Sequence, residues 1–202
     1  MTDIYLASQS PRRRELLAQI GITFEVLTFE IDESVKENEV PEKYVLRLAK
    51  EKALAGWEAS KQKDKPVLGS DTSVVVNGEI LGKPKDHNEA RRMLSLLSAQ
   101  THQVMTAIAL ASPSNIPLKP ELHSAVSVSN VSFKKLSEAE VERYINSGES
   151  DDKAGAYGIQ GMAAAFITHL SGSYSGVMGL PLYETAELLN KAGISADSLV
   201  VS

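Results

Sequence analysis

Residues 67–81 read VLGSDTSVVVNGEIL, and this stretch is the best guide to the fold. β-Branched residues surround Asn77-Gly78, the dipeptide most typical of a two-residue hairpin turn, so we predict a strand, a tight turn and a second strand. In that register the facing pairs are Val76 with Glu79, Val74 with Leu81 and Thr72 with Lys83. The hairpin therefore brings Lys83 beside the polar centre of the first strand, provided that a bulge or a strand end lets Asp71 and Lys83 converge.

Outside the hairpin, the sequence alternates between apolar runs of strand length and amphipathic helical patterns. The predicted strands are residues 4–7, 23–29, 104–111, 121–133 and 164–170, and the predicted helices are 11–20, 44–61, 88–97, one opened by Ser137, and 181–192. Residues 32–42 and 112–120 are predicted loops. Helices that alternate with strands and strand pairs are typical of an α/β fold with a mixed sheet.

Composition narrows the class of protein. The chain has 202 residues, which is the size of one domain, and its 43% hydrophobic and 23% charged residues exclude a disordered chain or a coiled coil. It has no cysteine, which excludes disulfides, a thiol nucleophile and zinc–thiolate sites. Its net charge of -5 argues against nucleic-acid binding. We see no signal peptide or membrane span, and we expect a cytoplasmic protein without a membrane partner.

The segment Ser10-Pro11-Arg12-Arg13-Arg14 places three arginines where a helix should begin. The first helical turn prefers acidic residues, and basic residues there are unfavourable by up to ~1 kcal/mol each. A bound anion would reverse that effect, because helix N-termini and arginine side chains both bind phosphate. Arg13 also continues the apolar stripe of Leu16, Leu17 and Ile20, which turns it toward the interior or a cleft. The alternative is a solvated arginine cluster paired with Glu15.

Two further charges lie at positions that favour apolar residues. Lys52 falls within the helical stripe of Val45, Leu48, Ala49 and Ala53, so it must snorkel, form a pair or face a cleft. Asp71 lies in the first strand of the hairpin, where an unpaired carboxylate would be costly. A structural salt bridge with Lys83 is the alternative for Asp71.

These segments together supply three arginines, two lysines and an aspartate in an acidic chain, which is what a phosphate-bearing ligand with a divalent metal would need. Asp71 and a second carboxylate could hold Mg²⁺ through oxygen ligands, and the segment Asp32-Glu33 is the nearest supplier in the sequence. Gly78–Lys83 resembles a P-loop but is one residue short, and Pro84 replaces the magnesium-binding hydroxyl.

The chain resembles the Maf family of nucleoside triphosphate pyrophosphatases over nearly its whole length. The matching segments are LASQSPRR (6–13), DE (32–33), GSDT (69–72), GKP (82–84), DKAGAYGIQG (152–161), GSY (172–174) and VMGLP (177–181). Each is modest alone, but their joint occurrence in this order is specific.

The resemblance implies a single Maf-like domain over 1–202 with a mixed twisted sheet, flanking helices and two lobes around a cleft, like the inosine triphosphate pyrophosphatases. It implies hydrolysis of dTTP and UTP to the monophosphate and pyrophosphate, with Mg²⁺ or Mn²⁺. Asp71 would be the catalytic proton acceptor, and Glu33 with Asp71 would hold the metal. The substrate-binding residues would be Ser8, Arg12, Arg13, Lys52, Thr72, Lys83 and Gln160. Of these, Arg13, Lys52 and Lys83 would hold phosphates, and Arg12, Thr72 and Gln160 would set specificity.

Three alternatives stay open at this point. The chain could act on 7-methyl-GTP, as another branch of the family does, or it could be a nucleotide-binding regulator of septum formation without significant turnover. It could also be a nucleic-acid-binding module, although its acidic balance argues against this. A homodimer is compatible with the sequence.

Overall fold

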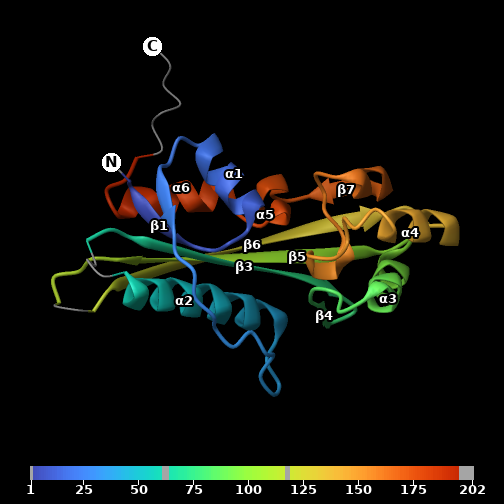
Figure 1. Cartoon of the computed structure of the whole chain (residues 1–202), viewed down its shortest axis with the longest axis horizontal. Coiled ribbons are helices and arrows are strands. Elements are labelled where there is room, and N and C mark those ends of the chain that lie inside the picture. Colours follow the sequence, from blue (N-terminus) through green and yellow to red (C-terminus); the bar gives the residue numbers. More distant parts are fainter. Residues whose placement is uncertain (1, 61–63, 117–118, 196–202) are drawn as a thin grey trace, which may run out of the picture. The chain divides into compact units, whose positions relative to one another are not determined.

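The computed structural model describes residues 2–60, 64–116 and 119–195. The elements in chain order are β1 (Ile4–Ala7), α1 (Pro11–Gln19), β2 (Phe24–Val26), α2 (Pro41–Ala59), β3 (Val67–Val76), β4 (Glu79–Leu81), α3 (His87–Leu97), β5 (Thr101–Ser112), β6 (Glu121–Phe133), α4 (Glu138–Ile145), the 3-10 helices η1 (Ala154–Ala156) and η2 (Met162–Phe166), β7 (Ile167–Ser171), α5 (Tyr174–Met178) and α6 (Leu182–Lys191). Figure 1 shows these elements along the chain.

The strands form one mixed sheet. Hydrogen-bonded neighbours follow the order β2-β1-β3-β5-β6-β7, and β4 pairs with β3. β1 runs parallel to both β2 and β3, whereas β4 is antiparallel to β3 and β7 is antiparallel to β6. The predicted α/β class with a mixed sheet and flanking helices is confirmed.

The hairpin forms in the predicted register. Val74 pairs with Leu81 and Val76 with Glu79, and the turn residues Asn77 and Gly78 have φ of 51° and 81°. Positive φ at both turn residues is the conformation that this dipeptide tolerates best. β4 ends at Leu81, so the predicted pairing of Thr72 with Lys83 lies beyond its end.

Two compact units share the chain, as a two-lobed fold implies. Unit 1 comprises residues 1–71, 106–127 and 179–202, and unit 2 comprises residues 72–105 and 128–178. In unit 1, α2 covers one face of the strands, while α1 and α6 lie on the other face (Figure 1). Contact between α2 and β3 is close: a Cβ on Gly69 would lie 2.4 Å from the backbone oxygen of Ala49, so only glycine fits there.

Unit 2 has its own apolar core. Its buried side chains come from β3, β4, α3, β5, β6, α4 and the segment around η1 and η2, among them Val74, Leu81, Met93, Leu94, Leu97, Val131, Phe133, Tyr144, Tyr157 and Phe166. α4 begins where the sequence predicted, directly after Ser137, and its start forms a capping box. The Ser137 hydroxyl accepts from the Glu140 N–H, and the Glu140 carboxylate accepts from the Ser137 N–H.

Some boundaries differ from prediction. α2 begins at Pro41, three residues before the predicted start, because proline is a good first helical residue. Its predicted end at Lys61, like Pro117 and Leu118 of the predicted loop, lies outside the described residues. The strand predicted at 164–170 begins only at Ile167, because η2 occupies the residues before it.

Candidate active site

The arginine-rich start of α1 lies directly after β1, at the carboxyl end of that strand. Pro11 is the first helical residue, and the hydroxyl of the N-cap residue Ser10 makes no capping hydrogen bond. The Ser8 hydroxyl makes hydrogen bonds beside the helix start: it accepts from the Ser10 N–H at 3.3 Å and from Arg13 Nη1 at 3.1 Å. No acidic residue lies in the first turn.

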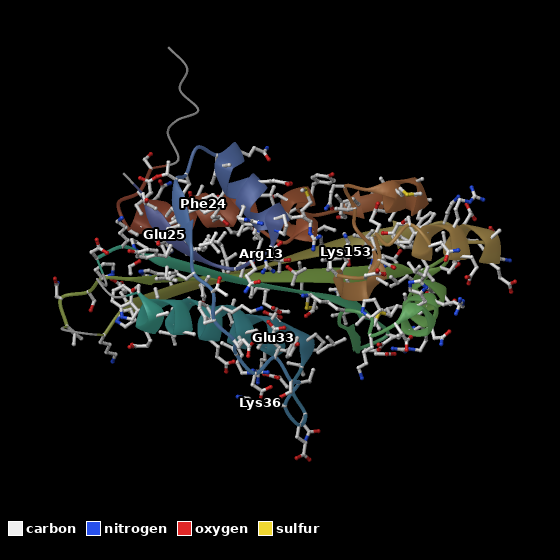
Figure 2. The ribbon with its side chains drawn as sticks, in the orientation of Figure 1. Arg13, Phe24, Glu25, Glu33, Lys36 and Lys153 are labelled. Carbon is white, nitrogen blue, oxygen red and sulfur yellow. The ribbon has the colours of Figure 1, made fainter. Side chains whose placement is uncertain are left out.

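Arg13 turns inward, as the helical stripe predicted. Its Nε donates to the Gly179 carbonyl at 2.8 Å, and Leu16, Leu17 and Ile20 on the same face are buried. Burial lowers the pKa of the Arg13 guanidinium, while the nearby Asp71 carboxylate opposes that shift. Figure 2 labels Arg13 on α1. The Gly179 carbonyl also accepts from the Ser70 hydroxyl at 2.9 Å, so it links the start of α1 to β3.

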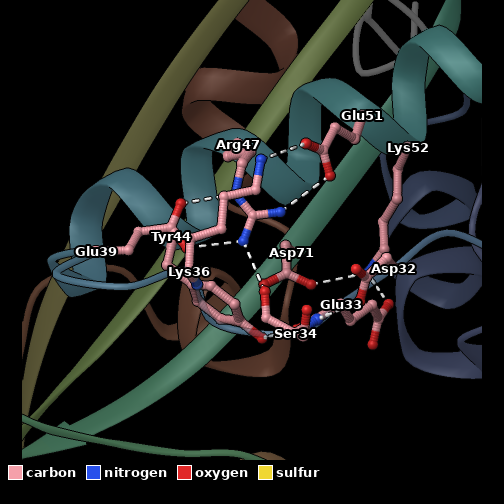
Figure 3. A network of polar contacts seen from close by, with 10 residues as sticks. All are labelled: Asp32, Glu33, Ser34, Lys36, Glu39, Tyr44, Arg47, Glu51, Lys52 and Asp71. Atoms are coloured by element: carbon pink, nitrogen blue, oxygen red, sulfur yellow. Dashed lines mark hydrogen bonds and ion pairs between the residues drawn. The ribbon is translucent and has the colours of Figure 1, made fainter.

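Lys52 contacts two carboxylates at once. Its Nζ lies 2.7 Å from Asp71 Oδ1 and 2.7 Å from Glu33 Oε1 (Figure 3). The neighbours Leu48, Ala49 and Ala53 in its helical stripe are buried, so Lys52 reaches the site along an apolar face. The pairing predicted as one alternative for Lys52 is confirmed, and its partners include the segment that was expected to supply a second carboxylate.

Asp71 is almost fully buried, with 8% of its surface exposed. Burial raises the pKa of its carboxyl group, and the positive charges of Lys52 and Arg13 act in the opposite direction. A carboxylate with a raised pKa is a better proton acceptor than an ordinary aspartate. In unit 1, Asp71 pairs with Lys52, whereas the alternative drawn from sequence was a salt bridge with Lys83.

The segment that carries Glu33 is held in place by α2. Arg47 donates from Nε and Nη2 to the Glu39 carboxylate at 2.6 and 2.7 Å, and from Nη2 to the Ser34 carbonyl at 2.9 Å. Tyr44 donates its hydroxyl hydrogen to the Glu33 carbonyl at 2.8 Å. Burial, together with the negative charges of Asp71 and Glu33, raises the pKa of Tyr44 to about 12.

Sequence reasoning missed Tyr44 and Arg47. Their partners lie in an irregular segment, so no helical or strand periodicity could have revealed them. The charge of Arg47 near the start of a long helix was the only available signal, and it is equally typical of a solvated surface.

Unit 1 thus brings together Ser8, Arg13, Glu33, Lys52 and Asp71, with Arg12 on the first turn of the same helix. The other three predicted site residues belong to unit 2. Thr72 follows Asp71 in β3, Lys83 is exposed just after β4, and Gln160 is exposed in the segment between η1 and η2.

The carboxylates suit a divalent cation by donor type. Asp71 and Glu33 converge on one cationic atom, Lys52 Nζ, and carboxylate oxygens are the ligands that Mg²⁺ prefers. Within residues 2–60, 64–116 and 119–195, no group of three or more His, Asp or Glu side chains is arranged to hold a metal ion. Two carboxylates plus oxygens of a bound phosphate ligand would make a site of the kind that Mg²⁺ commonly uses.

None of the helices in the described ranges is long and apolar enough to cross a membrane.

Several known proteins are similar to this chain. A dTTP/UTP pyrophosphatase of Chromobacterium violaceum is 50% identical over 195 residues, covering 95% of this chain and 96% of that protein. The dTTP/UTP pyrophosphatase of Escherichia coli strain K12 is 51% identical over 190 residues (94% and 93%), and that of Aliivibrio fischeri is 51% identical over 191 residues (93% and 97%). Among solved structures, the Staphylococcus aureus Ham1 protein matches with a TM-score of 0.42 and 16% identity, covering 65% of this chain and 72% of that one.

Residues 3–192 match the family described as Maf-like protein. The chain belongs to the Maf family.

Proposed function

We propose that this protein is a nucleoside triphosphate pyrophosphatase that hydrolyses dTTP and UTP to the monophosphate and pyrophosphate. One observation carries the proposal: relatives described as dTTP/UTP pyrophosphatases are about half identical to this chain along almost their full length. Arg13, Lys52 and Asp71 offer the charges that such a reaction needs, within one unit.

In the proposed reaction, water attacks the α-phosphorus, the bond between that phosphorus and the bridging oxygen breaks, and pyrophosphate leaves. Asp71 accepts the proton from the attacking water. Its burial and the resulting rise in pKa support this role, because an ordinary aspartate with a pKa near ~3.9 is a weak base. Phosphoryl chemistry of this kind depends mainly on positioning and charge neutralisation.

The cationic side chains hold the phosphates in this proposal. Arg13, Lys52 and Lys83 neutralise the negative charge on the leaving pyrophosphate, and the Ser8 hydroxyl adds a hydrogen-bonding group. Arg12 contributes to specificity, with Thr72 and Gln160. Lys52 must exchange at least one of its two carboxylate partners for phosphate oxygens when substrate binds.

A divalent cation, Mg²⁺ or Mn²⁺, would be held by Asp71 and Glu33 together with phosphate oxygens. When bound, such a cation neutralises phosphate charge and makes a coordinated water more acidic. The movement of Lys52 toward the phosphates would free both carboxylates for this role.

Base recognition belongs to unit 2 in the proposal. The Gln160 amide can both donate to and accept from a pyrimidine edge, which suits uracil and thymine, and Thr72 adds a hydroxyl. Gln160 is exposed, so its amide is accessible to a ligand.

The first experiment measures pyrophosphate release from a panel of nucleoside triphosphates with Mg²⁺, for the wild type and for Asp71→Asn. We expect turnover of dTTP and UTP that vanishes in Asp71→Asn. Asp64→Asn, at an exposed position, is the matched control and should retain the wild-type rate.

Three outcomes would contradict the proposal in different ways. Turnover confined to 7-methyl-GTP would keep the enzyme class but remove the pyrimidine role of Gln160. Retained turnover in Asp71→Asn would remove Asp71 as the base. No turnover of any nucleotide would leave a nucleotide-binding regulator as the better hypothesis. The single domain over 1–202, the cytoplasmic location and a homodimer stay predictions.

A further inference from the structure

The residues directly before Gln160 are buried, whereas Gln160 itself is exposed. Residues 155–159 are all buried, with Tyr157 and Ile159 each only 6% exposed, and Gln160 follows them at the surface. A hydrogen bond from the Gly161 N–H to the Gly158 carbonyl at 3.1 Å closes a turn around it. The chain therefore presents one amide side chain on a tightly packed turn.

The side chains of Tyr144 and Glu149 make hydrogen bonds on both sides of Gln160. The Gly158 N–H donates to the Tyr144 hydroxyl at 3.2 Å, and that hydroxyl donates to Glu149 Oε1 at 2.9 Å. The second oxygen of the same carboxylate, Glu149 Oε2, accepts from the Met162 N–H at 2.9 Å. The chain of bonds runs from two residues before Gln160 to two residues after it.

The Glu149 carboxylate lies very close to Gly161. A Cβ on Gly161 would lie 2.2 Å from Glu149 Oε1 and 2.4 Å from Oε2, so the carboxylate packs directly against the backbone of the turn. Tyr144 is fully buried, with 1% of its surface exposed, and a buried N–H such as that of Gly158 is costly to leave without an acceptor. The hydroxyl of Tyr144 and the carboxylate of Glu149 thus act together on the turn.

We infer that Tyr144 and Glu149 are positioning residues for base selection: they hold the 158–162 turn so that the Gln160 amide presents its donor and acceptor in one orientation. The inference rests on the proposed function, because it assumes that Gln160 contacts the base. In this inference, neither Tyr144 nor Glu149 contacts the substrate. Both act through the backbone N–H groups of Gly158 and Met162.

The test compares kcat/KM for UTP with kcat/KM for GTP in the wild type, Tyr144→Phe, Gln160→Ala and the double variant. Tyr144→Phe keeps the ring in the core and removes only the hydroxyl. We expect the UTP-to-GTP preference to fall about fivefold to tenfold in Tyr144→Phe, mainly through KM for UTP, with kcat nearly unchanged. The double variant should be no less selective than Gln160→Ala, because both changes act on one contact.

Two further variants separate positioning from general stability. Glu149→Gln offers one acceptor oxygen where the carboxylate offers two, so it should lower the preference as Tyr144→Phe does. Tyr5→Phe removes a hydroxyl from another buried tyrosine, in unit 1, and should leave the preference unchanged. Melting curves confirm that each variant is folded at the assay temperature.

The outcomes distinguish the inference from the proposed function. A wild type without turnover of UTP and dTTP overturns the proposed function. A selective wild type whose preference survives in both Tyr144→Phe and Glu149→Gln, yet falls in Gln160→Ala, overturns the inference alone. The same holds if Gln160→Ala keeps the full preference, because the turn would then not read the base.

Discussion

At the scale of one residue, the buried Asp71 carboxylate lowers the stability of the folded state. Burial raises the pKa of its carboxyl group above the value in an unfolded chain, so the folded state binds this proton more readily than the unfolded state. Its contribution to stability is therefore most favourable below the unfolded pKa near ~3.9 and is lost as pH rises through the folded value. The fold therefore holds the charged form of Asp71 at a cost that Lys52 and Arg13 only partly offset.

We therefore expect Asp71→Asn, which should be inactive, to be at least as stable as the wild type at pH 7.5. The gain should reach about 1 kcal/mol, or 2–4 °C in Tm. The difference should shrink as pH is lowered toward the titration of Asp71. Thermal melts of both proteins between about pH 4 and pH 8 measure this. A variant that melts several degrees lower would show that the pair with Lys52 is stabilising overall.

A second prediction at this scale concerns His102 and the pH dependence of stability. It is buried in unit 2, its Nε2 lies 2.8 Å from the Tyr157 hydroxyl, and burial lowers its pKa to about 4. The unfolded chain, with an ordinary histidine pKa of about 6.5, binds more protons than the folded one between these values. Stability attributable to His102 is present above about pH 6.5 and lost as pH falls toward 4, by about 3 kcal/mol in total.

His102→Gln should remove most of this acid dependence. Urea denaturation at a series of pH values between 4 and 7 gives the free energy of unfolding for both proteins. His87→Gln, at an exposed position, is the matched control for the replacement of a histidine by glutamine. Equal slopes for the wild type and His102→Gln would contradict the assignment.

At the scale of an element, α2 organises the segment before it. The Arg47 guanidinium binds Glu39 with two nitrogens and the Ser34 carbonyl with one, and only a planar fork can do this (Figure 3). The hydrogen bond from Arg47 holds the pKa of Glu39 at about 2, well below its usual range. The segment that carries Glu33 is thus fixed by one helix through charge-assisted hydrogen bonds.

Arg47→Lys should loosen this segment without unfolding the protein. We expect hydrogen exchange at the Lys36 N–H, which donates to Glu39 Oε2, to become about tenfold faster, because lysine cannot replace the fork. Exchange in β3 should stay slow. Arg91→Lys breaks a similar fork with Glu142 in unit 2 and is the matched control. Unchanged exchange at Lys36 in Arg47→Lys would show that backbone packing holds the segment.

At the scale of the whole molecule, the net charge of the protein and the charge of its proposed substrate, a nucleoside triphosphate, are both negative. The net charge of -5 repels a triphosphate at long range, so binding must depend on the local cations Arg13, Lys52 and Lys83. Interactions between exposed charges more than about 10 Å apart are screened at moderate salt, whereas close contacts in a partly buried site are screened less. The local cations therefore dominate binding at physiological salt.

A substrate analogue should stabilise the whole protein by mass action. With Mg²⁺ and α,β-imido-dTTP at about 100 times its Kd, we expect ~2.7 kcal/mol of stabilisation and a rise in Tm of roughly 5–10 °C. A thermal shift assay measures this, with α,β-imido-GTP at the same concentration as the control for base selection. Equal shifts with both analogues would contradict pyrimidine preference, and an equal shift in excess EDTA would contradict a role for the metal.

The sequence by itself determined the features that depend on neighbours along the chain. Asn77-Gly78 sets the hairpin and its register, because its positive φ values need no distant partner. Ser137 and Glu140 form their capping box for the same reason, and the helical stripe of α1 correctly turned Arg13 inward. The order of short motifs was also sufficient to identify the family.

Only the tertiary structure decided which side chains meet. Lys52 could have snorkelled or formed a pair, and its partners became clear only when β3 and the segment before α2 were placed beside it. Periodicity could not reveal the partners of Tyr44, Arg47, Tyr144 and Glu149, because those partners lie in irregular segments. The physical reason is general: periodicity reports which face a residue occupies, whereas a hydrogen bond depends on angstrom-scale distances between segments that are far apart in sequence.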